Sequence, residues 1–224
     1  MIKAVIFDLD DTLYPEKEYV FSGFKEAAAA FEKKYRVRDV FKTLAQLFLQ
    51  SRENVFDRLF DFYQIPCIAE DVKKLVSDYQ SHIPQIKPFN DAMPCIHALQ
   101  KKFRLGIITD GREIQQNRKI DALKIRALFD RIIITDCLGG IAFRKPNPKA
   151  FELMQESFDC GMSEIVYIGD NPQKDFYIKK TYPIKTIQVL RADAVYCNFP
   201  YKENVLPEYI LHDLSELSRL IDKI

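Results

Sequence analysis

Short apolar runs recur along the chain, and each ends in polar or acidic residues. The runs are rich in β-branched residues and are continuous rather than alternating, which is typical of strands buried on both faces of a parallel sheet. Helical patterns follow most of the runs, and this alternation predicts an α/β fold with a doubly wound parallel sheet. The runs cover residues 3–8, 104–110, 131–136, 164–170, 185–190 and 208–213.

The pattern changes between the first and second of these runs, where no convincing strand occurs. The stretch FSGFKEAAAAFEKKY consists largely of strong helix formers, and apolar residues recur after it at three- and four-residue spacings. Further helices are expected at 53–63 and 69–80. We therefore predict a helical insertion, residues 17–84, within a catalytic core formed by residues 1–16 and 85–224.

Composition limits the classes of partner. Lys and Arg number 33 against 32 Asp and Glu, and this balance gives no electrostatic footprint for nucleic acid or an anionic membrane. No stretch approaches the roughly 20 apolar residues of a membrane span, and the first apolar run is too short for a signal peptide. The five cysteines contain no close pair, which predicts reduced, mostly buried thiols and no zinc site. We expect a cytoplasmic protein; nothing in the sequence fixes its oligomeric state.

Acidic and hydroxyl residues stand at the ends of three predicted strands. In an open α/β sheet, ligands bind outside the carboxyl ends of the strands, so these side chains are expected to share one site. The residues at these ends are Asp8, Asp10, Thr109, Asp110, Gly111 and Asp170. Any one of these aspartates alone fits a solvated loop or a helix cap equally well; their joint arrangement favours a site.

Carboxylates held this close together repel each other, and a hard divalent cation such as Mg²⁺ offsets the repulsion. A carboxylate beside such a cation can attack phosphorus, and Asp8, closest to its strand, is the expected nucleophile. Asp10 is the expected acid and base, which protonates the leaving oxygen and then activates water. Asp170 is the further metal ligand expected from the other strand.

The remaining candidates would surround a transferred phosphoryl group. Thr109 offers a hydroxyl, and Lys145 offers a positive charge in a loop stiffened by two prolines. Asp175 is expected to orient Lys145 or a metal-bound water, and Asn171 to contact such a water or to turn the chain. Arg144, next to Lys145, is expected to be exposed.

Four segments in this order resemble the motifs of the haloacid dehalogenase-like hydrolase superfamily: DLDDT at 8–12, Thr109 closing its strand, RKPNP at 144–148 and GDNPQKD at 169–175. The resemblance extends along nearly the whole chain. It implies a Rossmann-like core with a small helical cap inserted after the first motif. The site residues that it implies are Asp8, the main-chain carbonyl of Asp10 and Asp170 for Mg²⁺, with Thr109 and Lys145 for phosphate; we add Asp110 and Gly111 as substrate contacts.

The residue at position 10 separates the chemistries of this superfamily. Its dehalogenases lack an aspartate there, because a halide leaves without protonation, so Asp10 favours a phosphatase. The expected substrate is a small phosphorylated metabolite, cleaved through an aspartyl-phosphate intermediate. A phosphomutase with the same intermediate remains an alternative, as does a non-catalytic phosphate-binding or signalling module.

Overall fold

The computed structural model describes residues 1–224 and contains one six-stranded sheet, in which all neighbouring strands pair in parallel. The strand order is β3-β2-β1-β4-β5-β6. The strands are β1 Ala4–Phe7, β2 Arg104–Thr109, β3 Arg131–Ile134, β4 Ile165–Gly169, β5 Lys185–Val189 and β6 Tyr209–Leu211. Each strand lies within one of the six apolar runs, so the predicted α/β fold with a parallel sheet is confirmed.

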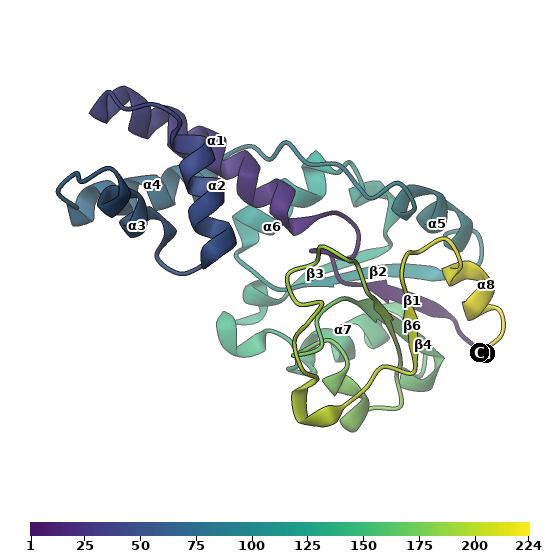
Figure 1. The fold of residues 1–224 in the computed structure, drawn as a ribbon. Helices are drawn as coiled ribbons and strands as arrows, with labels where there is room; N and C mark the ends of the chain where they lie inside the picture. Colours follow the sequence, from purple (N-terminus) through teal and green to yellow (C-terminus); the bar gives the residue numbers. More distant parts are fainter. The chain divides into compact units, whose positions relative to one another are not determined.

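Helices cover both faces of this sheet. Every residue of β1 has no exposed surface, and successive strand residues point to opposite faces, so neither face of β1 is open to solvent. Helix α7 (Lys149–Phe158) contacts β2 and β3, and α5 (Ala92–Leu99) contacts α8 (Leu217–Ile221). Figure 1 shows α7 on one side of the sheet and α5 with α8 on the other.

The order of the strands reverses beside β1. The chain runs from β1 to β2 and β3 on one side, then crosses back to β4, β5 and β6 on the other side. The switch point therefore lies between β1 and β4, which pair directly. A doubly wound sheet binds ligands at this position, outside the carboxyl ends of its strands. Asp8 follows β1 and Asp170 follows β4, so both stand at the switch point.

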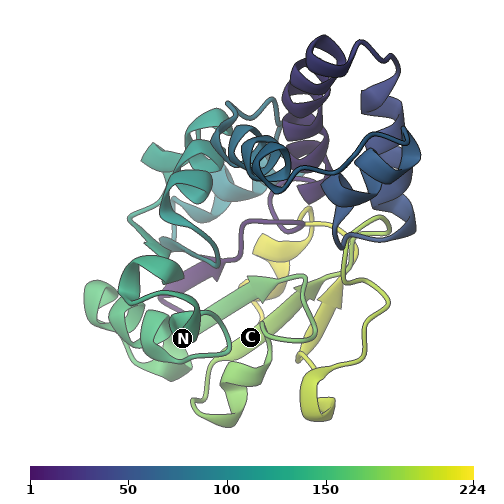
Figure 2. The same cartoon turned by 90° about the vertical axis from the view of Figure 1, so that its left-hand side faces the viewer.

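The chain divides into two compact units, one of Met1–Glu16 with Lys87–Ile224 and the other of Lys17–Ile86. The second unit has its own apolar core, in which Phe24 packs edge-to-face on Phe56, and Phe31 on Phe60. Its helices, gathered together in Figures 1 and 2, are α1 Glu16–Tyr35, α2 Val40–Gln50, α3 Val55–Phe62 and α4 Ala69–Ser81. The role of this unit as a cap stays a prediction. No helix of the chain is both long enough and apolar enough to cross a membrane.

All five cysteines are free thiols. Only Cys95 and Cys160 are buried, whereas Cys67 and Cys137 are exposed and Cys197 is half-buried, so the expectation of mostly buried thiols is wrong. The reason is their position: Cys95 lies on α5 among buried residues, but the three accessible cysteines lie outside the α-helices and strands, in loops or a short turn.

Candidate active site

Asp8 directly follows β1, and its side chain is almost completely buried. Its main-chain N–H donates a hydrogen bond to the carbonyl oxygen of Ile168 on β4, with 2.7 Å between N and O, which ties the residue to the switch point. Its Oδ1 lies 2.7 Å from Nζ of Lys145. Burial raises the pKa of Asp8 to about 6, although the charge of Lys145 opposes this rise. The strand and the lysine therefore hold this carboxylate in one position.

Lys145 contacts a polar partner on each side. Its Nζ lies 2.8 Å from Oδ1 of Asp175 and 2.7 Å from the hydroxyl oxygen of Tyr167. Tyr167 also donates a hydrogen bond to Asp175, with 3.1 Å between the oxygens. Burial disfavours the ammonium form, but Asp175 and Asp8 outweigh it and raise the pKa of Lys145 above its usual value. Lys145 is thus a fixed, charged group and not a solvated loop lysine.

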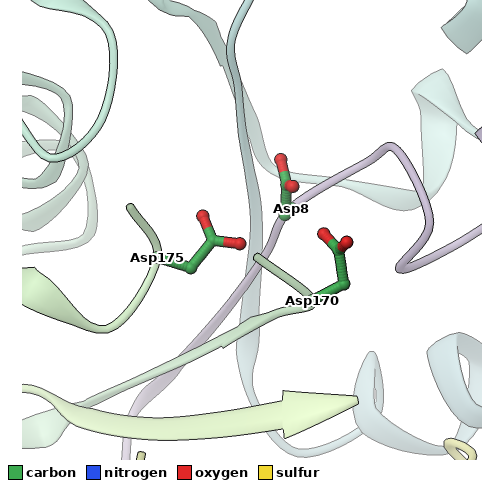
Figure 3. A group of neighbouring side chains, drawn as sticks. All are labelled: Asp8, Asp170 and Asp175. Carbon is green, nitrogen blue, oxygen red and sulfur yellow. The ribbon is translucent and has the colours of Figure 1, made fainter. Parts of the chain in front are cut away.

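Three carboxylates gather at this edge of the sheet. Oxygen atoms of Asp8, Asp170 and Asp175 all lie within 4.8 Å of one another, and Figure 3 shows their side chains together. Oδ2 of Asp170 is buried and has no hydrogen-bond partner. Burial, followed by the charges of Asp175 and Asp8, raises the pKa of Asp170 well above its usual value. An unpartnered buried oxygen is costly, and a cation bound beside it would supply the missing partner.

The charge balance of the site also fits a divalent cation. When ionised, the three clustered aspartates and Asp110 carry four negative charges, and the adjoining lysines, Lys145 and Lys174, carry two positive ones. Lys174 Nζ lies 2.9 Å from Oδ2 of Asp110. Mg²⁺ prefers carboxylate, water and phosphate oxygens, and its charge would favour the ionised form of these aspartates. The residues present therefore fit Mg²⁺, and Asp8 and Asp170 would hold it.

Asp10 is not part of this carboxylate cluster. Its Oδ1 lies 2.7 Å from Nζ of Lys119, and its Oδ2 accepts a hydrogen bond of 3.1 Å from Nε2 of Gln116. Burial opposes ionisation of Asp10, but Lys119 and the hydrogen bonds hold its pKa below the usual value. Asp8 and Asp10 therefore have different lysine partners, Lys145 and Lys119, although both line the same cavity. Metal ligation through the main-chain carbonyl of Asp10 stays a prediction.

The end of β2 brings further predicted residues to the site. Thr109 is fully buried, and its Oγ1 accepts a hydrogen bond from Nε2 of Gln116. Oδ1 of Asp110 accepts the main-chain N–H of Lys145, with 3.0 Å between the atoms. Gly111 has φ +138°, and a Cβ atom there would lie 3.1 Å from Cδ of Gln116. Asp110 is therefore committed to partners within the protein, and its role as a substrate contact stays a prediction.

The segment after β4 is shaped by its own hydrogen bonds. Asn171 accepts the N–H of Gln173 through Oδ1 and donates its own N–H to Oδ2 of Asp175, each at 2.9 Å. A Cβ atom on Gly169 would lie 2.7 Å from Cγ of Asp175, so only glycine lets Asp175 lie against the strand end. Asn171 turns the chain, and Gly169 makes room for the carboxylate that holds Lys145.

A cavity of about 190 Å³ opens at this edge of the sheet unit. Arg144, which was expected to be exposed, lines this cavity. It forms a bidentate ion pair with Asp136, in which both N to O distances are 2.7 Å. The lining residues are Asp8, Asp10, Asp11, Glu16, Asp110, Arg144, Asp170, Asn171, Lys174 and Tyr196. The residues that line the cavity therefore include the expected nucleophile, the expected acid and base, and the predicted metal ligands.

The sequence analysis missed several polar residues of this neighbourhood, among them Gln116, Lys119, Tyr167, Lys174 and Tyr196. Lys174 precedes Asp175 within GDNPQKD, and its place inside a motif is a signal that could have revealed it. Gln116 and Lys119 lie on α6 (Glu113–Ala122), where a polar face looks like an ordinary solvated one until the fold buries it. Tyr196 lies in the loop after β5, which has no motif.

The buried carboxylate and lysine pair lies at the switch point of a parallel sheet, the position at which α/β enzymes bind their ligands. A family model described as haloacid dehalogenase-like hydrolase matches residues 5–189. The chain belongs to this family and is a hydrolase. The resemblance inferred from its four motifs is confirmed.

Known proteins along the whole chain agree with this assignment. A glyceraldehyde 3-phosphate phosphatase from Methanopyrus kandleri is 28% identical over 203 residues, covering 86% of this chain and 85% of that protein. The protein of the same name from Methanocaldococcus jannaschii is 24% identical, covering 99% and 96%. The structure of a magnesium-bound HAD hydrolase from Bacillus subtilis superimposes with a TM-score of 0.72 at 19% identity, covering 99% of both chains, and so shares the fold.

Proposed function

We propose that this protein is a Mg²⁺-dependent phosphomonoester hydrolase that cleaves a small phosphorylated metabolite through an aspartyl-phosphate intermediate. The observation that carries the proposal is the Asp8–Lys145 pair at 2.7 Å, with the carboxylate of Asp10 lining the same cavity. Two relatives are named glyceraldehyde 3-phosphate phosphatase, which makes this three-carbon phosphate the first substrate to test.

In the first half of the proposed reaction, a carboxylate oxygen of Asp8 forms a bond to phosphorus opposite the leaving oxygen. The bond from phosphorus to the leaving oxygen breaks, its electron pair stays on that oxygen, and Asp10 in its protonated form supplies the proton. Thr109 accepts its hydrogen bond from Gln116, which leaves its own hydroxyl hydrogen for a phosphate oxygen. Lys145 offsets negative charge on the phosphoryl group. Asp8 and Asp170 would hold Mg²⁺, which would supply further positive charge beside the phosphoryl group.

In the second half, water attacks the phosphorus of the aspartyl-phosphate. Asp10 as carboxylate takes a proton from that water, and the bond between phosphorus and Asp8 breaks with its electron pair returning to the carboxylate. Inorganic phosphate and free Asp8 are the products. Lys119 and the hydrogen bonds hold the pKa of Asp10 below its usual value, which favours the carboxylate form that takes the proton in this step.

The test measures phosphate release from glyceraldehyde 3-phosphate and from an aryl phosphate, with Mg²⁺ and with chelator, by wild type and Asp8→Asn. Turnover by the wild type with Mg²⁺, loss in chelator, and a loss of at least about 10³-fold in Asp8→Asn support the proposal. Asp159→Asn is the matched control, because Asp159 is exposed and has the left-handed conformation that asparagine tolerates. Turnover that survives in Asp8→Asn would contradict an aspartyl-phosphate.

The phosphomutase alternative predicts a different product. A sugar phosphate would then be converted to its isomer with little phosphate release, because the phosphoryl group returns to substrate rather than to water. Following both products in the same reaction separates the two activities. A folded wild type that produces neither, and whose Asp8 is not labelled by beryllium fluoride, would instead support a non-catalytic module.

A further inference from the structure

Helix α6 presents two buried polar side chains to the site. Gln116 is 2% exposed and Lys119 is 6% exposed, although most of the helix is polar and its outer face is solvated. The two residues are three apart, so they lie on the same face of the helix. Burying a lysine is costly unless a partner receives its charge, so the helix face has a specific partner in the site.

That partner is Asp10, whose two carboxylate oxygens have separate donors on α6. Lys119 Nζ lies 2.7 Å from Oδ1, and Gln116 Nε2 lies 3.1 Å from Oδ2. The hydroxyl of Tyr14 also donates to Oδ1. The carboxylate is therefore fixed both in direction and in rotation, because a single donor would leave it free to turn about its last bond.

Gln116 also connects Asp10 to a second site residue. Its Nε2 donates to Oγ1 of Thr109 as well as to Asp10, so one amide group spans the ends of two neighbouring strands, β1 and β2. The Lys119 contact joins residues 109 positions apart in the chain. α6 therefore sets the position of Asp10 relative to the predicted phosphate contact Thr109.

We propose that Lys119 and Gln116 are positioning residues that hold Asp10 as the base for hydrolysis of the aspartyl-phosphate, an inference that rests on the proposed function. In that step the oxygen of water bonds to phosphorus, and Asp10 takes a proton from the water. The bond from phosphorus to Asp8 breaks, and its electron pair returns to Asp8. Loss of either α6 donor loosens Asp10, and loss of both leaves it held by the hydroxyl of Tyr14 and free to turn about its last bond. Either change slows this step more than formation of the intermediate.

The test separates the two half-reactions with an aryl phosphate whose leaving group departs readily and needs little proton donation. Mixing enzyme with this substrate and quenching in acid allows the fraction of phosphorylated protein to be read by intact mass. In Lys119→Met we expect steady-state turnover to fall by about 10- to 100-fold, within the contribution of a general base. We also expect a burst of one leaving group per active site and accumulation of phosphorylated protein.

Lys119→Arg keeps the positive charge and is expected to restore turnover to within about fivefold of wild type, without accumulation. Lys101→Met, which changes an exposed lysine away from the site, is the matched control and is expected to behave as wild type. Turnover that falls in Lys119→Met without any rise in phosphorylated protein would overturn the proposal, because a purely structural defect slows both half-reactions. Unchanged turnover would also overturn it.

Gln116→Met is a second variant that tests the same proposal if Lys119→Met does not fold. It keeps the side-chain length and the Lys119–Asp10 pair but removes the donor to Oδ2 of Asp10 and to Oγ1 of Thr109. Accumulation of phosphorylated protein in this variant supports the proposal, and its absence contradicts it. Failure of the proposed function is distinguishable: wild type would then release no phosphate and show no phosphorylated Asp8, whatever the variants do.

Discussion

Lys145 Nζ lies 2.7 Å from Oδ1 of Asp8, and neither side chain is more than 3% exposed. The same ammonium contacts Asp175 at 2.8 Å, which also has no exposed side-chain surface. One buried cation therefore compensates two buried carboxylates. Removing one member of such a group leaves charge uncompensated in a medium of low dielectric constant, and this asymmetry makes the site sensitive to single substitutions.

Lys145→Met is expected to lower the free energy of unfolding by about 3–5 kcal/mol, because Asp8 and Asp175 lose their shared partner. Adding Asp175→Asn to this variant should recover part of the loss, since it removes one unpaired charge. Urea unfolding in chelator measures both. Lys149→Met, at a half-exposed ion pair on α7, should change stability by less than about 1 kcal/mol. A loss in Lys145→Met as small as this control would contradict the compensation argument.

Mg²⁺ is expected to stabilise the wild type against heat and to stabilise Asp170→Asn much less. A ligand at 100 times its dissociation constant adds about 2.7 kcal/mol, and each kcal/mol shifts Tm by about 2–4 °C in a protein of this size. In chelator the order should reverse, with Asp170→Asn melting at or above wild type, because Oδ2 of Asp170 has no partner there.

Thermal melts of wild type and Asp170→Asn, each in Mg²⁺ and in chelator, test this reversal of the order of Tm. Asp159→Asn is the control, and it should keep the full response of the wild type to Mg²⁺. Equal responses of wild type and Asp170→Asn would show that Asp170 does not hold the cation.

Gly169→Ala should damage both stability and turnover. The new Cβ atom would lie 2.7 Å from Cγ of Asp175, so the carboxylate must move away from Lys145. We expect a cost of about 1–3 kcal/mol from the forced shift and a loss of turnover of at least about tenfold. Urea unfolding and phosphate release measure the two effects.

Gly161→Ala is the matched control for this change, because its Cβ atom would meet nothing nearer than 3.6 Å and its φ of −77° suits alanine. This variant should lie within about 1 kcal/mol of wild type. If the two glycine variants behave alike, the close approach of Asp175 to the strand end is not needed.

Tyr196→Ala is expected to change substrate binding rather than chemistry. Tyr196 is the one aromatic residue among those that line the cavity, and its loop is tied to the site by the N–H of Val195, which donates to Oδ2 of Asp11 at 2.8 Å. We expect KM to rise by about 3- to 30-fold with kcat within about threefold, as for a contact equal in ground and transition states. Steady-state kinetics on the preferred phosphomonoester measure both constants.

Leu206→Ala is the control within the same loop, since Leu206 is exposed and does not line the cavity. It should leave both constants unchanged. A fall in kcat with unchanged KM in Tyr196→Ala would assign the residue to the chemical step and contradict a binding role.

The sequence alone predicted the six strands and the edge of the sheet where Asp8, Thr109 and Asp170 stand. Both results depend on local information: a continuous apolar run indicates a buried strand, and parallel strands bring their carboxyl ends to one edge whatever their order. The order and spacing of the motifs added Lys145 and Asp175. These residues can be identified without knowing how the elements pack, because each lies at the end of an element, just beyond it, or within a motif.

The tertiary structure decided which groups face one another. It paired the carboxylate of Asp10 with Lys119, brought Asp175 together with Asp8 and Asp170, and paired Lys174 with Asp110. The Lys119–Asp10 pair joins positions 109 residues apart and the Lys174–Asp110 pair positions 64 apart, and both depend on how α6 and the loops pack on the sheet. A polar helix face has the same sequence pattern whether it meets water or a carboxylate, so only the packing of α6 could reveal that Lys119 is buried.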